Sequence, residues 1–160
     1  MQLNETLDYA ADPDTVFAML CDQSWREEVC RRTHATEYTV TVEQSGDDVV
    51  VRTTRVVPAP EGAKKIVGST LTVEQTETWG SADAGGARRA DLDIAIKGQP
   101  AGMRGSITLT SSGTGSTEAV TGQVKVRIPF IGAKFEPLIA DAIKSAIAKE
   151  GQVGREYLAD

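Results

Sequence analysis

The sequence predicts an α+β fold in which an antiparallel sheet of about seven strands grips one long C-terminal helix. From Thr36 onwards, alternating apolar and polar residues are separated by short segments rich in glycine, serine and proline, as in strands joined by tight turns. After Pro129, apolar residues recur at intervals of three and four, which is typical of an amphipathic helix. This helix must bury its apolar face, so we expect it to close over the sheet. Gly151 and Gly154 each cost roughly 1 kcal/mol against alanine and are expected to weaken its end.

The N-terminal segment predicts one strand followed by two short helices. Residues 2–9 alternate between apolar and polar side chains, as a half-buried strand does. Asp12 followed by Pro13 matches a helix N-cap with proline at the first helical position. Ser24–Glu27 fits a capping box, which predicts the start of a second helix that ends near His34.

Six further strands are predicted after these helices. Pro58 and Pro60 cannot donate hydrogen bonds to a sheet, so we expect a loop there, with a helical turn at Ala63–Val67. The other short connections are hairpins, which makes the sheet an antiparallel meander. The predicted strands are Glu37–Gln44, Asp48–Val57, Thr70–Trp79, Arg88–Lys97, Met103–Thr110 and Thr117–Ile128.

Composition limits the classes of function. A length of 160 residues fits one domain, so we expect residues 1–160 to fold as a single unit. The formal charge of -6 opposes binding to nucleic acids and to anionic membrane surfaces, which attract clustered Lys and Arg. No apolar stretch is long enough to span a bilayer, so we expect no integral membrane contact. Few cysteines and no signal-peptide pattern predict a reduced, cytoplasmic protein.

No set of residues forms a catalytic or metal-binding signature. His34 is the only histidine and is expected to cap a helix end or face solvent. Cys21 and Cys30 lack the spacing of metal ligands and are expected to be small apolar side chains. We therefore predict no catalytic residues, no metal and no cofactor.

Strand alternation selects the polar residues that could face an interior cavity. Glu5, Arg55, Gln75 and Glu77 each share the face of apolar neighbours on their strand. Either they line a cavity, where a carboxylate needs a partner such as Arg55, or a bulge or strand end turns them to solvent. Large apolar residues on the surrounding elements either fill that space or line it. The candidate ligand-binding residues are Glu5, Tyr9, Trp25, Arg55, Gln75, Glu77, Trp79, Met103, Phe135 and Ile139.

The order of one strand, two helices, six strands and a long helix resembles the START-like superfamily, also called SRPBCC. This superfamily includes the birch-pollen allergen, polyketide cyclases and lipid-transfer domains. Particular segments are similar to an actinobacterial family of unknown function within it. The resemblance covers nearly the whole chain and implies a helix-grip fold, but its motifs belong to the scaffold, so no catalytic residue is carried over. The segments are Asp12–Phe17 with Leu20, Glu28–Cys30, Gly68–Trp79, Pro129–Gly132 and Glu136–Ile139.

Three functions fit these observations, and the first is favoured. It is the binding or carriage of an apolar small molecule (a lipid, an isoprenoid or a polyketide-like compound) in a cavity between the sheet and the C-terminal helix. Small residues such as Ala90, Gly105 and Ala142 would leave space for it, although a packed core fits the sequence equally well. The second is a cyclase or dehydratase that uses inward-facing Glu and Arg residues to move protons. The third is a protein-interaction module with a closed core. The sequence leaves the ligand and the oligomeric state open.

Overall fold

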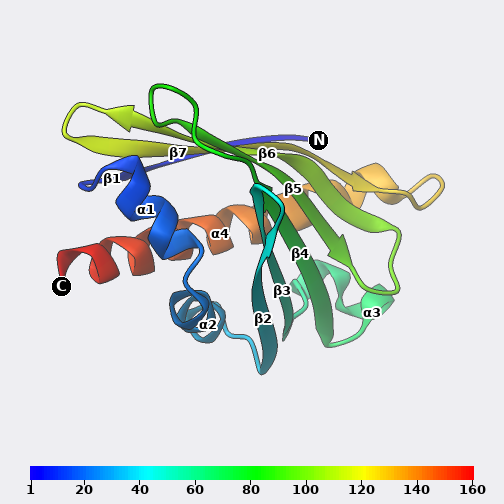
Figure 1. The fold of residues 1–160 in the computed structure, drawn as a ribbon. Coiled ribbons are helices and arrows are strands. Elements are labelled where there is room, and N and C mark those ends of the chain that lie inside the picture. Colours follow the sequence, from blue (N-terminus) through cyan, green and yellow to red (C-terminus); the bar gives the residue numbers. More distant parts are fainter.

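The computed structural model describes residues 1–160 and is built around one seven-stranded antiparallel sheet (Figure 1). Its strand order is β1-β7-β6-β5-β4-β3-β2, so β2 to β7 form a meander and β1 is added beside β7. This confirms the predicted α+β helix-grip fold. The strands are β1 (Gln2–Tyr9), β2 (Glu37–Ser45), β3 (Asp48–Pro58), β4 (Thr70–Trp79), β5 (Arg88–Ile96), β6 (Ala101–Ser112) and β7 (Gly115–Val126).

The helices begin close to where the caps predicted them. Asp12 caps the first helix as expected, because its carboxylate accepts a hydrogen bond from the Thr15 amide at 2.8 Å. The cap of the second helix is Asp22 rather than Ser24: the Asp22 carboxylate accepts from the Trp25 amide at 2.7 Å and from the Ser24 hydroxyl. The helices are α1 (Pro13–Leu20), α2 (Gln23–Arg32), the 3-10 turn η1 (Glu61–Ala63), α3 (Lys64–Val67) and α4 (Gly132–Ala159).

Helix α4 crosses one face of the sheet and packs against β1, β7 and α2 (Figure 1). Although Gly151 and Gly154 were expected to weaken its end, the helix continues through both to Ala159. Both glycines are buried. A Cβ atom would lie 2.7 Å from a Leu7 methyl if placed on Gly151, and 2.8 Å from the Tyr9 ring if placed on Gly154. They therefore let the helix approach β1 more closely than any side chain would permit.

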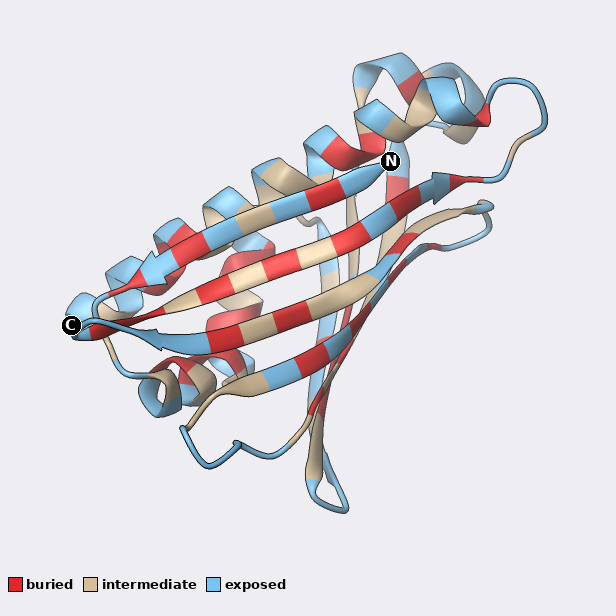
Figure 2. Cartoon of the chain, turned by 90° about the horizontal axis from the view of Figure 1, so that it is seen from above, coloured by how far each residue is buried: buried red, intermediate tan, exposed pale blue.

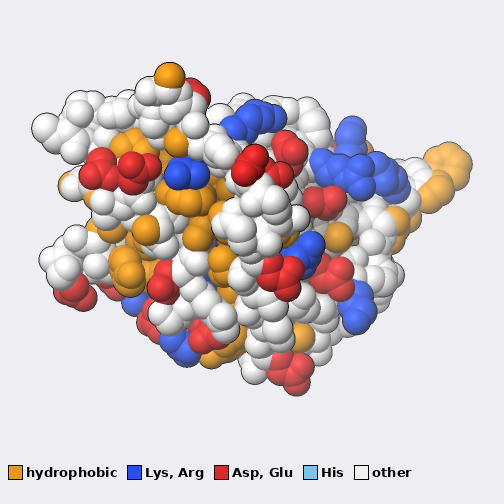
Figure 3. All heavy atoms as spheres, viewed as in Figure 1, with side chains coloured by type: hydrophobic (Ala, Val, Ile, Leu, Met, Phe, Trp, Pro, Cys, Tyr) orange, Lys and Arg blue, Asp and Glu red, His pale blue; other side chains and the backbone are white.

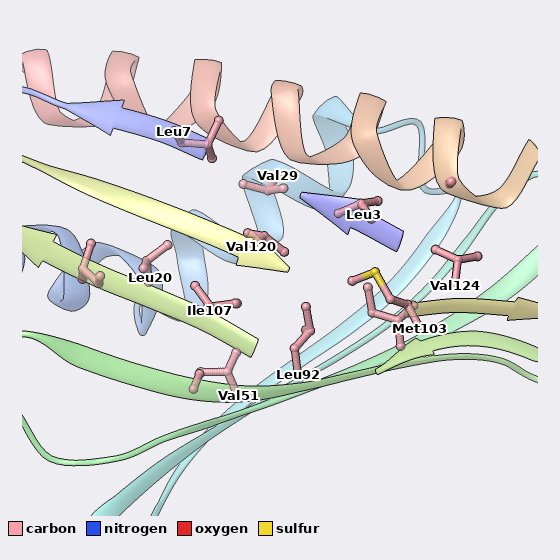
Figure 4. Packing of buried hydrophobic residues seen from close by; sticks show 14 of the residues in the cluster. Leu3, Leu7, Leu20, Val29, Val51, Leu92, Met103, Ile107, Val120 and Val124 are labelled. Atoms are coloured by element: carbon pink, nitrogen blue, oxygen red, sulfur yellow. The ribbon is translucent and has the colours of Figure 1, made fainter. Parts of the chain in front are cut away.

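The apolar core lies between the sheet and the helices α1, α2 and α4, each of which contributes buried side chains to it. Figure 2 shows buried and exposed residues alternating along the strands, as strands with one covered face require. Met103 and Val124 are paired across β6 and β7 and lie close to Leu3 (Figure 4). Trp79 is fully buried and packs edge-on against Phe17, with ring centroids 5.6 Å apart. None of the helices is long and apolar enough to cross a membrane.

In the middle of the sheet, Gly105 of β6 faces Gly122 of β7. A Cβ atom on Gly105 would overlap the Thr121 carbonyl oxygen and lie 2.5 Å from the Gly122 Cα. Glycine is therefore needed here for the close approach of two backbones. The expectation that Gly105 leaves open space is wrong. Ala90 is fully buried in the core, and Ala142 lines the cavity.

We expect Gly105→Ala to lower the free energy of unfolding by about 1–3 kcal/mol or more, because the added methyl forces β6 and β7 apart. Gly80→Ala is the matched control, since a Cβ there would lie 3.8 Å from its nearest neighbour, an ordinary contact. Urea denaturation of both variants measures the difference. Equal stabilities would contradict a steric requirement at Gly105.

Candidate functional site

The sheet and α4 enclose a cavity of about 410 Å³. A volume of this size falls in the range of sites that hold a small organic molecule. Its wall is mostly aliphatic, and it is formed by the inner face of the sheet and by the middle turns of α4. The apolar lining residues are Val57, Leu71, Val73, Leu92, Ile94, Ile96, Ile107, Val120, Ile139, Ala142, Ile143, Ala146 and Ile147.

The cavity opens to solvent beside the middle of α4. Its exposed lining residues include His34 after α2, Pro58 at the end of β3 and Ser145 on α4. His34 has a left-handed backbone with φ of 66°, and this turn leads the chain from α2 into β2. The mouth therefore lies between the α2–β2 connection, the end of β3 and α4.

A buried ion pair, Arg26 with Glu77, closes one end of the cavity. The guanidinium donates from Nη1 and Nη2 to the two carboxylate oxygens at 2.9 and 2.7 Å, and from Nε to the Leu20 carbonyl at 2.6 Å. Glu77 also accepts from Gln75 at 2.7 Å and from the Trp79 indole at 2.9 Å. Both charged side chains are at most 4 % exposed. The pair satisfies the conditions under which a buried charge is tolerated.

Glu118 on β7 lies at the same end of the cavity and is 1 % exposed. Its Oε2 accepts a hydrogen bond from the Tyr9 hydroxyl at 3.1 Å. Burial, followed by the nearby charges of Glu150 and Glu77, raises the pKa of Glu118 to about 8, although Arg26 opposes this. At neutral pH, Glu118 is therefore mostly a neutral carboxylic acid, and it can donate a hydrogen bond to a molecule in the cavity.

Four further charged residues line the cavity: Arg32, Arg55, Lys149 and Glu150. Glu150 on α4 lies 3.7 Å from Arg26, and burial raises the pKa of its carboxyl. Arg55 on β3 is half-buried and donates to the Thr33 hydroxyl at 3.4 Å. The suggested pairing of an inward carboxylate with Arg55 is wrong for Glu77, because Glu77 is paired with Arg26.

The predicted cavity residues fall into three groups. Arg55, Gln75, Glu77 and Ile139 line the cavity together. Tyr9 does not line the cavity but is hydrogen-bonded to Glu118, which does. Phe135 lines an adjoining pocket of about 30 Å³. The residues outside the lining are Trp25, Trp79 and Met103, which are buried in the core, and Glu5, which is half-buried on β1.

A family model described as "Protein of unknown function (DUF2505)" matches residues 4–158. The chain belongs to this family. A comparison with curated protein sequences finds no match. The match covers both the strands and the helix that form the cavity, so the cavity lies within the segment that defines this DUF2505 protein.

Solved structures show that the DUF2505 chain has the START-like fold. The STAR-related lipid transfer protein of Xanthomonas axonopodis is 12% identical, with a TM-score of 0.65 over 99% of this chain and 86% of that one. The Zhui aromatase/cyclase of Streptomyces sp. R1128 is 12% identical, with a TM-score of 0.63 over 98% and 92%. A START superfamily protein of Mycobacterium smegmatis is 13% identical, with a TM-score of 0.59 over 98% of both chains. At such identities, the likeness concerns the fold alone.

Sequence reasoning missed Arg26, Glu118 and Glu150 in the DUF2505 chain. Glu118 has the same parity as Val120 on β7, so the alternation rule would have placed it inside. Glu150 follows Ile147 by one turn on α4 and faces the same cavity. Arg26 carried no signal, because α2 is rich in charged residues.

No three His, Cys, Asp or Glu side chains are placed to hold a metal ion, and both cysteines are free thiols.

We expect Arg26→Gln to lower the free energy of unfolding by about 3–5 kcal/mol, because it leaves the buried Glu77 carboxylate without its cation. Arg52→Gln is the control, since Arg52 pairs with Glu43 at 3.2 Å on the surface, where a pair contributes about 0–1 kcal/mol. Urea denaturation at pH 7 measures both variants. A similar small loss in each would show that the buried pair does not stabilise the fold.

The raised pKa of Glu118 predicts a stability that falls as pH rises. Its pKa is about 8 in the fold against 4.5 ordinarily, so between these values the folded state binds a proton that the unfolded state has lost. Unfolding is then favoured by up to about 1.4 kcal/mol per pH unit from this group. The titratable and charged groups that face Glu118 are Tyr9 on β1, Glu77 on β4, Arg26 on α2 and Glu150 on α4.

Glu118→Gln keeps a neutral polar group and removes the titration, so its unfolding free energy should depend less on pH between about 5 and 8. The measurement is urea denaturation of both proteins across that range. Parallel pH profiles would mean that Glu118 is ionised in the fold.

Proposed function

We propose that this protein binds and carries an apolar small molecule, such as a lipid, an isoprenoid or a polyketide-like compound, between the sheet and α4. The observation that carries the proposal is the cavity of about 410 Å³, whose wall is largely aliphatic and whose fully buried polar groups, Glu77 and Glu118, lie at one end. A closed interaction module would fill this space with side chains, since protein interiors are close-packed. An open apolar cavity instead favours a ligand.

The polar end supports a ligand with an apolar body and one hydrogen-bond acceptor. The neutral carboxyl of Glu118 supplies a donor inside the cavity, and its Oε1 has no partner within the protein. A carbonyl, ether or hydroxyl oxygen placed there would satisfy that group and leave the rest of the molecule against the aliphatic wall.

The hydrogen bonds of Glu77 and the position of Glu5 give less support to the cyclase or dehydratase alternative. Both oxygens of Glu77 already accept hydrogen bonds from Arg26, Gln75 and Trp79, so taking up a proton on Glu77 would disrupt the ion pair. Glu5 lies outside the cavity lining. One structural neighbour is named for lipid transfer, which supports an apolar ligand, and another is named as an aromatase/cyclase.

Native mass spectrometry of protein purified gently from its own cells should show an excess mass that disappears on denaturation. We expect Ala146→Phe to lower the affinity of the delipidated protein for fluorescent fatty acids or isoprenoids by at least about tenfold, because the ring occupies the cavity. Ala148→Phe is the matched control, since Ala148 is exposed on the same helix and does not line the cavity.

Fluorescence titration at equal protein concentrations compares the three proteins. Saturable binding that Ala146→Phe does not weaken would place the ligand elsewhere. A clean ligand-free mass, together with no saturable binding of any probe, would count against the proposed function.

A further inference from the structure

One end of the molecule carries exposed apolar side chains on a protruding loop. Phe130, in the β7–α4 connection, is fully exposed (108%), and Ile131 after it is 40% exposed. Ile66 of α3 is 48% exposed and lines the same small pocket as Ile128, at the base of this connection. Figure 3 shows an apolar protrusion where Figure 1 places the β7–α4 connection. We call Ile66, Phe130 and Ile131 the apolar tip.

The backbone holds Phe130 in this position at a conformational cost. Its φ is 70°, in the left-handed region that bulky side chains rarely adopt. Only His34 shares this feature among the residues other than glycine. An aromatic ring kept in full contact with water by a strained backbone suggests a surface that binds a partner.

Basic residues without carboxylate partners surround the apolar tip. Lys125 and Arg127 lie near the end of β7, where the Arg127 amide donates to the Pro100 carbonyl in the β5–β6 turn that follows Lys97. The acidic residues nearby are already paired, Glu136 with the N-terminal amine and Glu61 with Lys64. Figure 3 shows Lys and Arg side chains clustered beside the protrusion. We call this set the basic collar: Lys65, Lys97, Lys125, Arg127 and Lys134, none of which forms an ion pair.

We propose that the apolar tip and the basic collar dock on the surface of an anionic lipid bilayer. Phe130 and Ile131 would enter the interface between headgroups and acyl chains, and the collar would bind the lipid phosphates. A bilayer receives a protruding side chain without a shaped pocket, and exposed unpaired cations can bind a surface of many anionic groups. The net charge of -6 does not prevent this, because salt screens charges beyond about 10 Å.

The docking surface lies close to the cavity. The small pocket under Ile66 shares Leu71, Ile96 and Ile139 with the main cavity. A docked molecule would therefore hold the α3 end of the cavity near the bilayer. This last step rests on the proposed function, whereas docking itself does not.

Vesicle flotation of the ligand-free protein tests the proposal. We expect binding to vesicles of phosphatidylcholine mixed with phosphatidylglycerol, weak binding to phosphatidylcholine alone, and release by salt. Phe130→Asp should weaken binding to the mixed vesicles about tenfold or more, and it should not disturb folding because the side chain has no buried contacts. Tyr157→Asp is the matched control, since Tyr157 is 46% exposed in the last turn of α4, at the opposite end of this helix from the β7–α4 connection.

Charge reversal tests the collar separately. The double substitution Lys125→Glu and Arg127→Glu should remove the preference for anionic vesicles. Arg52→Glu with Arg89→Glu changes the net charge equally, at exposed positions outside the collar, and should keep that preference. Equal losses in the two double variants would mean that net charge alone decides.

Other outcomes would overturn the proposal. These are no binding to anionic vesicles, binding that Phe130→Asp leaves unchanged, or a dimer in sedimentation that Phe130→Asp dissociates, which would assign the tip to a second copy of the chain. Titration of fluorescent fatty acids without vesicles distinguishes the docking proposal from the proposed carrier function. Phe130→Asp should bind these probes like the wild type, so a wild type that binds vesicles but no probe would contradict only the carrier function.

Discussion

The ion pair between Arg26 and Glu77 is the interaction on which the cavity depends. It joins α2 to the middle of the sheet, and Arg26 also attracts Glu150 on α4, so one guanidinium connects three elements that are distant in sequence. Removing either charge would leave the other uncompensated in an apolar interior. The pair therefore fixes where α2 sits, and this position closes one end of the cavity with polar groups instead of aliphatic ones.

At the end of the cavity that Arg26 and Glu77 close, there are more carboxyl groups than cations. This imbalance decides the protonation state of Glu118. Arg26 is fully engaged with Glu77 and stands near Glu150, which leaves Glu118 without a cation of its own. In a low-dielectric site, the least costly solution is to keep a proton on Glu118. A carboxyl that would accept hydrogen bonds in water thus becomes a donor inside the cavity. The Tyr9 hydroxyl, whose pKa burial raises, stays protonated and donates to it.

Local signals in the sequence predicted the fold well, because alternation, turn residues and helix caps act over a few positions. The same alternation found Gln75, Glu77 and Arg55 in the cavity wall. It could not separate side chains that fill the interior from those that line it, so Trp79 and Met103 were candidates although both are buried in the core. Nor could it find the partner of Glu77, since Arg26 is 51 residues away and lies in a helix of mostly charged residues. The net charge of -6 was also a poor guide, because it sums over all residues. It gives no sign of the unpaired cations of the basic collar, which lie at one end of the molecule.

The cavity persists because close contacts of α4 lie at the two ends of the helix. At its start, a side chain on Gly132 would overlap the Val126 carbonyl oxygen, and near its end Gly151 and Gly154 touch β1. Between these contacts, Ile143 and Ile147 are only partly buried and line the cavity. Backbone approach through glycine, rather than the size of the lining side chains, thus sets the distance between helix and sheet.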